Sequence, residues 1–434
     1  MQASRFNIIS RIKDSPDYFV INILSGNADI ISPGEARLLE GDSALTPNEF
    51  RQKGYIVDPV QEMLQYRLKY IDFIEKREQE EVQVFFVPTY QCNFSCSYCY
   101  QSEYPESPAS LSSKVTDAFF NFLETRLKGR KKYITLFGGE PFLGGKSYKD
   151  SLAYFIERCA TSDIEIAAVT NGYHLDEYFE MLSAARVREI QLTLDGPEQM
   201  HNLRRPHKGG MPTFKRIVEN LEKCLALGYS VNLRVVVDRE NINELPALAR
   251  FAIERGWTSN PNFKTQLGRN YELHYCQSAK GKLFTRLELY QELHQLIKIH
   301  PEILEFHKPA FSVSKFLAEN GSLPEPLFDS CPACKSEWAL DFSGKVYSCT
   351  ATVGKPGEEI GTFFPEIQLD DKSISFWQER DTLHIEKCAA CNLQLACGGG
   401  CGSVAKNQFG NLLAPDCRPV KELLELGMDL YLNS

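Results

Sequence analysis

The sequence predicts an α/β protein built around a parallel sheet, with a small mixed module in front of the sheet and a cysteine-rich region behind it. From residue 83 to about residue 300, strand-like apolar runs alternate with amphipathic helix-like stretches, which is typical of strand–helix–strand units. Short strand and helix signals are mixed before this region, and eight of the 14 cysteines follow it. We therefore expect three parts, residues 1–82, 83–309 and 310–434.

Composition argues against some partners and compartments. Of the 434 residues, 43% are hydrophobic and 24% are charged, as in ordinary globular proteins. The net charge of -9 argues against a nucleic-acid partner, because phosphates favour a basic surface, but it is compatible with a basic peptide. The sequence contains no apolar run of about 18 residues, so no membrane helix is expected. The first residues show no secretion signal. We expect a cytoplasmic protein with no membrane partner.

In the front module, helix caps and strand composition give the order of the elements. A Ser or Thr followed by Pro, with Glu three residues on, marks a helix start, because the hydroxyl caps the first turn. The expected order is a strand at 18–24, a strand at 28–31, short helices starting at Ser32 and Thr46, a strand at 54–58 and a longer helix from about 60 to 80.

Five strands are expected in the parallel region, and helices lie between them. In barrels of parallel strands, the active site lies at the carboxyl ends of the strands. The expected strands are 83–88, 133–137, 164–169, 189–194 and 230–237, and the clearest helices are 117–127, 151–160 and 213–227.

Three cysteines directly follow the first of these strands, at Cys92, Cys96 and Cys99. Three thiolates from one short loop can hold a [4Fe–4S] cluster while leaving its fourth iron open to a small molecule. A zinc knuckle is the alternative, but structural zinc is usually closed by four protein ligands, and this loop contains no histidine.

Further polar motifs follow the second, third and fourth strands. They are Gly138-Gly139-Glu140-Pro141, then Thr170-Asn171-Gly172, then Thr193-Leu194-Asp195-Gly196-Pro197 with His201, Arg204 and Arg205 just beyond. Glycines allow close approach of a ligand to the backbone, and a carboxylate can hold an ammonium group. The alternative for the two arginines is a solvated surface pair, and His201 could equally be a structural residue that orients its loop.

The cysteines of the last part are clustered, which indicates metal sites where thiols stay reduced. They are Cys331, Cys334, Cys349, Cys388, Cys391, Cys397, Cys401 and Cys417. Eight thiolates suffice for two fully ligated [4Fe–4S] clusters, and a pair of zinc sites is the alternative. With little periodicity, this region is expected to be held together by metals more than by an apolar core. The isolated Cys159, Cys224 and Cys276 are expected to be small buried residues.

The C-x3-C-x2-C spacing, with Tyr98 before the last cysteine, resembles the radical S-adenosylmethionine (SAM) superfamily. The resemblance implies a partial (β/α)6 TIM-type barrel in which the open iron chelates SAM. An external one-electron reductant of flavodoxin or ferredoxin type would then drive cleavage of SAM to a 5'-deoxyadenosyl radical. It also implies SAM contacts from Tyr98, Gly138, Gly139, Glu140, Asn171, Thr193 and Arg205, with Glu140 and the glycines on the amino group and Arg205 on the carboxylate.

The last seven cysteines, from Cys334 onward, resemble the SPASM extension of one branch of this superfamily. The resemblance implies three [4Fe–4S] clusters, one that binds SAM and two auxiliary ones with interleaved ligands. Cys331, the eighth cysteine, lies closer to Cys334 than in some relatives, so the first auxiliary cluster could instead have an open iron. The implied sets are Cys331, Cys334, Cys349 and Cys401 for the first cluster, and Cys388, Cys391, Cys397 and Cys417 for the second.

SPASM enzymes mostly act on peptides and proteins, so the resemblance implies a peptide-modifying oxidoreductase that cross-links a ribosomally made peptide through a thioether, ether or carbon–carbon bond. The first alternative is oxidation of a protein Cys or Ser to formylglycine, as in sulfatase maturation. Thr350 stands where such relatives carry an aspartate base, although Asp195, Glu140 or Asp341 could substitute. The second alternative is a non-enzymatic metal-bearing scaffold that binds peptides. Residues 1–82 resemble a winged-helix-like module that binds a leader peptide, and the alternative is a structural cap.

Overall fold

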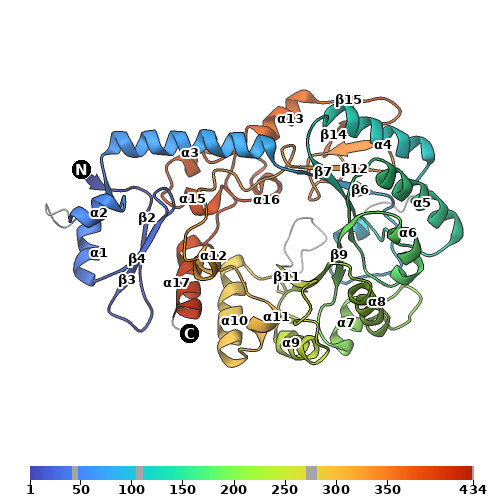
Figure 1. The fold of residues 1–434 in the computed structure, drawn as a ribbon, viewed down its shortest axis with the longest axis horizontal. Coiled ribbons are helices and arrows are strands. Elements are labelled where there is room, and N and C mark those ends of the chain that lie inside the picture. Colours follow the sequence, from blue (N-terminus) through green and yellow to red (C-terminus); the bar gives the residue numbers. More distant parts are fainter. Residues whose placement is uncertain (42–46, 104–110, 270–280, 433–434) are drawn as a thin grey trace.

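One ten-stranded sheet organises the computed structural model, which describes residues 1–41, 47–103, 111–269 and 281–432 (Figure 1). Its strand order is β11-β10-β9-β8-β7-β6-β12-β13-β14-β15, and β6 to β11 are parallel. These six strands form the expected partial barrel, with β11 as the strand that the sequence did not reveal. They are β6 (Val82–Val87), β7 (Lys132–Leu136), β8 (Ile166–Val169), β9 (Val187–Thr193), β10 (Val231–Val237) and β11 (Phe263–Arg269).

Helices cover the outer face of the barrel strands, so each strand has one buried face and one face toward the barrel interior (Figure 1). In β10, Val231, Leu233, Val235 and Val237 are buried, whereas the alternate residues are partly exposed. The outer core is rich in aromatic rings, and Phe86 stacks on Phe155 at 4.5 Å. The covering helices are α4 (Ser113–Arg126), α5 (Lys146–Thr161), α6 (Phe179–Ser183), α7 (Glu198–Arg204), α8 (Phe214–Ala226), α9 (Leu245–Glu254), α10 (Arg286–Ile299) and α11 (Ile303–Phe306), with 3-10 turns η1 (Tyr100–Glu103), η2 (Leu175–Tyr178) and η3 (Ile242–Glu244).

The cysteine-rich region extends the barrel sheet. Strand β12 (Glu337–Asp341) pairs in parallel with β6, whose edge the open barrel leaves unpaired. Trp338, Leu340 and Phe342 are buried in the same apolar core as the barrel, so the expectation of a region with little core was wrong. The other elements are β13 (Lys345–Tyr347), β14 (Glu359–Thr362), β15 (Gln368–Leu369), α12 (Ser314–Asn320), α13 (Asp371–Gln378), α14 (Glu386–Ala389), α15 (Gln394–Cys397), α16 (Gly402–Phe409) and α17 (Val420–Tyr431).

The front module follows the expected order and adds two strands that were not anticipated, β1 (Gln2–Ala3) and β2 (Asn7–Arg11). Ser32 caps α1 in a reciprocal capping box with Glu35, as expected, whereas Thr46 lies outside the described residues. Strands β2-β3-β4 form an antiparallel sheet, and β1 pairs with β5. The elements are β3 (Tyr18–Asn22), β4 (Asn27–Ile31), α1 (Pro33–Leu39), α2 (Asn48–Gln52), β5 (Ile56–Val57) and α3 (Pro59–Gln79).

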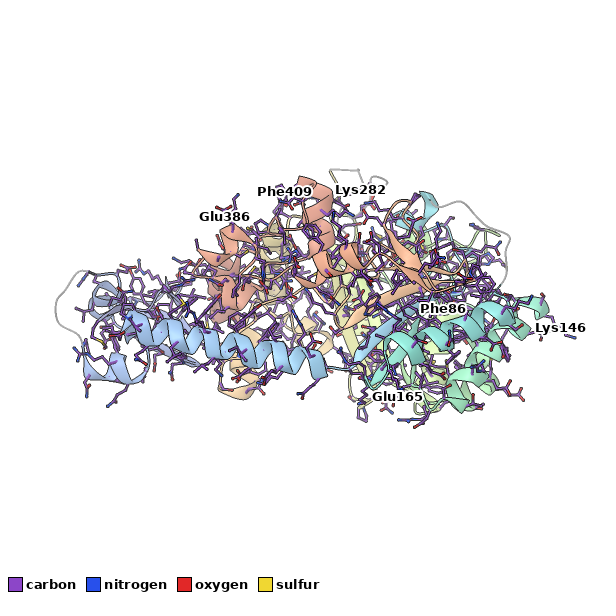
Figure 2. All side chains as sticks on the ribbon, turned by 90° about the horizontal axis from the view of Figure 1, so that it is seen from above. Phe86, Lys146, Glu165, Lys282, Glu386 and Phe409 are labelled. Atoms are coloured by element: carbon purple, nitrogen blue, oxygen red, sulfur yellow. The ribbon has the colours of Figure 1, made fainter. Side chains whose placement is uncertain are left out.

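Helix α3 runs along one long face of the molecule and connects the front module to the start of the barrel (Figures 1 and 2). Its Tyr66 stacks on Phe6 at 5.3 Å and meets Phe328 edge-on at 5.2 Å, so the module shares an apolar core with the cysteine-rich region. Among the described residues, no helix has the length and hydrophobicity that a membrane span requires.

Candidate active site

The loop of Cys92, Cys96 and Cys99 begins just beyond the carboxyl end of β6, where the barrel fold predicts an active site. The end of α7 and the residues after it fix the loop, because Ser97 N donates to Arg204 O at 3.0 Å and Ser95 N donates to Pro206 O at 2.9 Å. The three thiols are half-buried. Burial, the Glu140 carboxylate and the two other thiols raise the pKa of Cys92 to about 12, so the free Cys92 thiol stays protonated at neutral pH.

The two glycines after β7 let their loop lie directly on the loop after β6. A Cβ on Gly139 would lie 2.1 Å from Gln91 O, and a Cβ on Gly138 would lie 2.6 Å from Val87 Cγ1. The two loops are joined by hydrogen bonds from Gly139 N to Thr89 O (3.1 Å) and from Glu140 N to Gln91 O (2.8 Å). Glycine is therefore needed here for contact between backbones, beside any contact with a ligand.

Glu140 is 1% exposed, and its carboxylate connects the ends of β7 and β8. It accepts hydrogen bonds from Thr170 Oγ1 (2.6 Å), Asn171 N (2.6 Å) and Phe142 N (2.8 Å). Burial raises its pKa. Asn171 in turn donates to Asn93 Oδ1 at 2.7 Å, so the structure brings these residues against the cysteine loop, and Glu140 orients them.

Tyr98, Asp195 and Arg205 form a buried chain beside Cys96. Arg205 Nη1 donates to the Tyr98 hydroxyl at 2.6 Å, and that hydroxyl donates to Asp195 Oδ2 at 2.5 Å. The Nε of Arg205 is buried and has no hydrogen-bond partner among the described residues. An unsatisfied guanidinium N–H next to a cysteine loop suits the carboxylate of a SAM molecule, the role expected for this residue.

The surface-pair alternative for the two arginines is wrong, because Arg204 and Arg205 are 2% and 8% exposed. Arg204 is held by two parallel hydrogen bonds to Asp238, from Nη1 to Oδ1 and from Nη2 to Oδ2, both 2.9 Å. His201 is fully buried, and its Nδ1 accepts from Asp195 N at 3.3 Å. Burial and Arg205 hold the His201 pKa far below its usual value, which fits the structural role considered for it.

The eight C-terminal thiols gather into two groups. Burial, then Glu337 and the thiols of Cys331 and Cys401, raise the pKa of Cys349, and the thiol of Cys331 also raises the pKa of Cys334. Burial and the thiols of Cys397, Cys417 and Cys391 raise the pKa of Cys388 to about 11. The thiols that raise one another's pKa belong to the same set in the pattern that the resemblance implies, and their role as cluster ligands stays a prediction. Cys159 and Cys224 are fully buried, as expected, and Cys276 lies outside the described residues.

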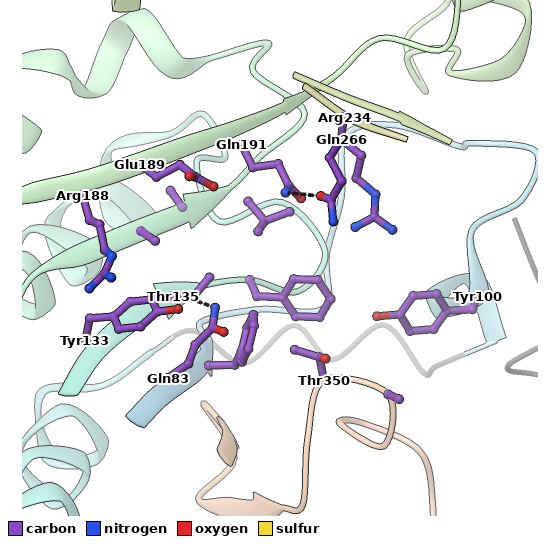
Figure 3. A pocket seen from close by; sticks show the side chains of 16 residues that line it. Gln83, Tyr100, Tyr133, Thr135, Arg188, Glu189, Gln191, Arg234, Gln266 and Thr350 are labelled. Carbon is purple, nitrogen blue, oxygen red and sulfur yellow. Dashed lines mark hydrogen bonds between the residues drawn. The ribbon is translucent and has the colours of Figure 1, made fainter. Parts of the chain in front are cut away.

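A cavity of about 400 Å³ lies in the barrel interior (Figure 3). Tyr100, next to Cys99, and Thr350, next to Cys349, both line it. Its other polar lining comes from inward-facing strand residues: Gln83, Tyr133, Thr135, Arg188, Glu189, Gln191, Arg234 and Gln266. These residues were missed from the sequence, because only the strand register shows that alternate polar residues of neighbouring strands share one face.

Three carboxylates were considered as a substitute base, and protein groups already occupy all three. Asp341 accepts from the hydroxyls of Tyr90 (2.8 Å) and Tyr347 (3.1 Å) with one oxygen, and from Ser343 with the other. Asp195 accepts from Val236 N and Tyr98, and Glu140 has the three donors described above. Thr350 is itself held by Glu337, which accepts from its N (2.7 Å) and Oγ1 (2.9 Å).

Comparison with known proteins agrees with this geometry. Residues 86–252 match the family model described as Radical SAM superfamily. The chain is similar to a GTP 3',8-cyclase of Nautilia profundicola, at 28% identity over 43% of this chain and 57% of that protein. It is also similar to a cysteine-type anaerobic sulfatase-maturating enzyme of Clostridium perfringens (22% identity, 79% of this chain, 91% of the relative) and to the mycofactocin maturase MftC of Mycolicibacterium smegmatis (24%, 72% and 76%).

Two solved structures share the fold. The anaerobic sulfatase-maturating enzyme anSMEcpe with bound AdoMet superposes with a TM-score of 0.61 at 18% identity, over 81% of this chain and 98% of that chain. Streptococcus suis SuiB bound to precursor peptide SuiA superposes with a TM-score of 0.53 at 15% identity, over 96% of this chain and 98% of that chain.

Residues 86–252 therefore form a radical SAM domain, which implies SAM and one [4Fe–4S] cluster as cofactors. The chain's similarity to the sulfatase and mycofactocin maturases agrees with the SPASM-like branch that the cysteine spacing resembles. The non-enzymatic scaffold is thereby set aside. Since the chain spans only 57% of the length of the GTP 3',8-cyclase that it matches, that cyclase's reaction is not carried over to this chain.

Proposed function

We propose that this enzyme oxidatively modifies a ribosomally made peptide and closes an intramolecular thioether, ether or carbon–carbon cross-link. The observation that carries the proposal is the barrel cavity, whose lining includes Tyr100 from the first cysteine loop and Thr350 from the first auxiliary set. A peptide side chain in this cavity is within reach of both regions. The relatives that are peptide and protein maturases support the same class of substrate.

Each of the three cysteine groups would bind a different iron–sulfur cluster. Cys92, Cys96 and Cys99 would hold the SAM-binding cluster, with Arg205 donating to the SAM carboxylate. Bound SAM supplies a 5'-deoxyadenosyl radical when an external flavodoxin- or ferredoxin-type protein delivers an electron. The sets headed by Cys331 and Cys388 would each hold an auxiliary cluster.

The chain's own residues would supply position, seclusion and a route for one electron. A cross-link leaves the peptide two hydrogens lighter, so after the first hydrogen atom is removed, one electron and one proton must also leave. The buried Cys349 and its neighbours adjoin the cavity wall at Thr350, where that electron would depart. The barrel wall keeps water from the reacting carbon.

The front module would bind a leader segment of the peptide. In the β2-β3-β4 sheet, β4 is an edge strand with no strand partner on its outer side among the described residues. An extended peptide can add to such an edge through backbone hydrogen bonds. Ile30 on β4 is 61% exposed and would contact an apolar side chain of the leader.

Sulfatase-type oxidation of Cys or Ser is the second candidate, favoured by the alignment that covers 91% of the sulfatase-maturating relative. The occupied carboxylates and Thr350 argue against it, because that reaction requires a base at the substrate.

The test is an anaerobic reaction of the iron-loaded protein with SAM, a reductant and a short peptide encoded next to its gene. Mass spectrometry would follow the peptide and 5'-deoxyadenosine. A peptide lighter by two hydrogens supports the proposal, whereas 5'-deoxyadenosine with an unchanged peptide, and formylglycine formed in a sulfatase peptide, would favour the second candidate.

A further inference from the structure

Arg234 carries the one charged group in the barrel cavity that has no partner within the described residues. Its Nε is buried without a hydrogen bond. The other charged residues that line the cavity are paired: Arg188 with Glu81 and Glu165, and Glu189 with Lys264 and Asn232. A guanidinium in a partly enclosed site loses hydration, and a negatively charged group offsets that loss best, so the cavity suits an anionic group.

A second donor lies beside Arg234. Gln266 is its direct neighbour on β11, and parallel register partners project to the same side of the sheet. Gln191 Nε2 donates to Gln266 Oε1 at 2.8 Å, which fixes the Gln266 amide and leaves its nitrogen as a donor (Figure 3). The guanidinium and the amide nitrogen can therefore donate together to the two oxygens of one carboxylate.

The backbone leaves room for this arrangement. A Cβ on Gly268 would lie 3.0 Å from Nε and 3.1 Å from Nη2 of Arg234, so glycine lets the guanidinium lie over β11. Thr193 is the register partner of Arg234 on β9, which puts the guanidinium beside the strand end where SAM is expected. The SAM carboxylate is expected at Arg205, next to Cys96, which leaves Arg234 for the substrate.

We propose that Arg234 and Gln266 bind a carboxylate of the substrate peptide, either an Asp or Glu side chain or the C-terminal carboxylate, and so position the peptide in the cavity. The proposal rests on the peptide substrate proposed above. Arg234 acts as a positioning and specificity residue, and the barrel would then prefer a substrate with an acid at a fixed distance from the modified residue.

The test compares the holoenzyme with its Arg234→Gln and Arg234→Lys variants, and with Arg250→Gln as a matched control, since Arg250 lies on the surface helix α9 and pairs with Glu302. The probe is the peptide encoded next to the gene, in its native form, with its acidic residues changed to amides, and with an amidated C-terminus. Peptide binding is measured by fluorescence anisotropy. SAM binding and peptide-independent 5'-deoxyadenosine formation are measured separately.

Arg234→Gln should weaken native-peptide binding by roughly tenfold or more, the usual effect of losing a hydrogen bond between charged groups. Arg234→Lys should recover part of the affinity, and Arg250→Gln should bind as wild type. One neutralised peptide should bind wild type and Arg234→Gln equally, and which peptide does so identifies the carboxylate. An unchanged affinity in Arg234→Gln, an equal loss for every peptide form, or a loss of SAM binding overturns the proposal.

A second experiment, thermal denaturation with a small carboxylate in place of the peptide, tests this inference independently of the proposed function. N-acetylglutamate should raise the melting temperature of wild type and of Arg250→Gln, but not of Arg234→Gln. An Arg234-dependent rise in melting temperature with N-acetylglutamate, together with no binding of the peptide, would contradict the proposed peptide substrate and support the carboxylate site. Equal shifts in all three proteins, or a larger Arg234-dependent shift with pyrophosphate, would overturn the carboxylate site.

Discussion

The two auxiliary cysteine sets lie in different surroundings. Cys331, Cys334 and Cys349 are 5%, 1% and 6% exposed and pack in the main apolar core with β12. In the second set only Cys388 is buried, Cys391 and Cys397 are half-buried, and Cys417 is exposed. The first set adjoins the cavity, whereas the second lies beside the front module, where Arg5 Nη2 donates to Ala389 O at 2.9 Å. The difference suggests that the inner set accepts an electron from the substrate and that the outer set exchanges electrons with an external carrier protein.

The largest effect should come from the barrel loop, which neither auxiliary set can replace. We expect Cys96→Ala to abolish 5'-deoxyadenosine formation, because the SAM-binding cluster loses one of only three thiolates. Iron should fall by about one third, with both auxiliary sets still loaded. Chromatographic assay of 5'-deoxyadenosine checks this, and full SAM cleavage by the variant would contradict the cluster assignment.

Substitution in the inner set should separate the two half-reactions. We expect Cys349→Ala to retain SAM cleavage without peptide but to form no cross-linked product, since the electron has no acceptor near the cavity. The melting temperature should fall by about 5 °C or more, because the free energy of cluster binding is part of folding. Product formation at the wild-type rate would show that the inner set is not needed for the oxidation.

Substitution in the outer set should have a smaller effect. We expect Cys417→Ala to give product in a single turnover and to lose rate only in multiple turnovers with a protein electron carrier. Its exposed position predicts a melting temperature within about 2 °C of wild type. If Cys417→Ala lost single-turnover product as completely as Cys349→Ala, the proposed division between inner and outer sets would be wrong.

The smallest effect is expected at the front module. Ile30→Asp should weaken binding of a full-length precursor by about three- to tenfold, because an apolar contact at the β4 edge is replaced by a charge. It should leave binding of a leaderless peptide unchanged. Ile299→Asp is the matched control, since Ile299 is 72% exposed and lies on α10 of the barrel. If Ile30→Asp and wild type bound the precursor equally, the alternative that residues 1–82 are only a structural cap would be favoured.

Much of the fold followed from local signals, and the missed parts have physical reasons. The expected barrel strands were apolar on their outer face, whereas β11 (Phe263–Arg269) contains three consecutive polar residues, Lys264, Thr265 and Gln266, and none of its residues is fully buried. Strand β12 is short and lies between cysteines, so its pairing with β6 could not be seen from spacing. Pairing of that kind depends on which sheet edge is free, which is a property of the completed barrel.

The sequence predicted the motifs of the site but not the hydrogen-bond and charge partners of their side chains. The sequence identified Glu140 and Arg205, but it could not show that three donors surround Glu140, or that Arg205 Nε has no acceptor in the part of the chain that the structure describes. Arg204 and Arg205 look equivalent in the sequence, and only the position of Asp238 separates them. Arg234 carried no motif at all, because its significance depends on the charges of neighbouring strands in the barrel interior.

The shared core of Phe6, Tyr66, Phe328 and Leu424 has a consequence for biosynthesis. During translation the front module emerges before the cysteine-rich region, and the shared core is completed only when α17 has been synthesised. The barrel can close before then. The outer cysteine set, which adjoins this late-forming contact, would therefore stay open to the delivery of iron and sulfide until α17 docks against the front module.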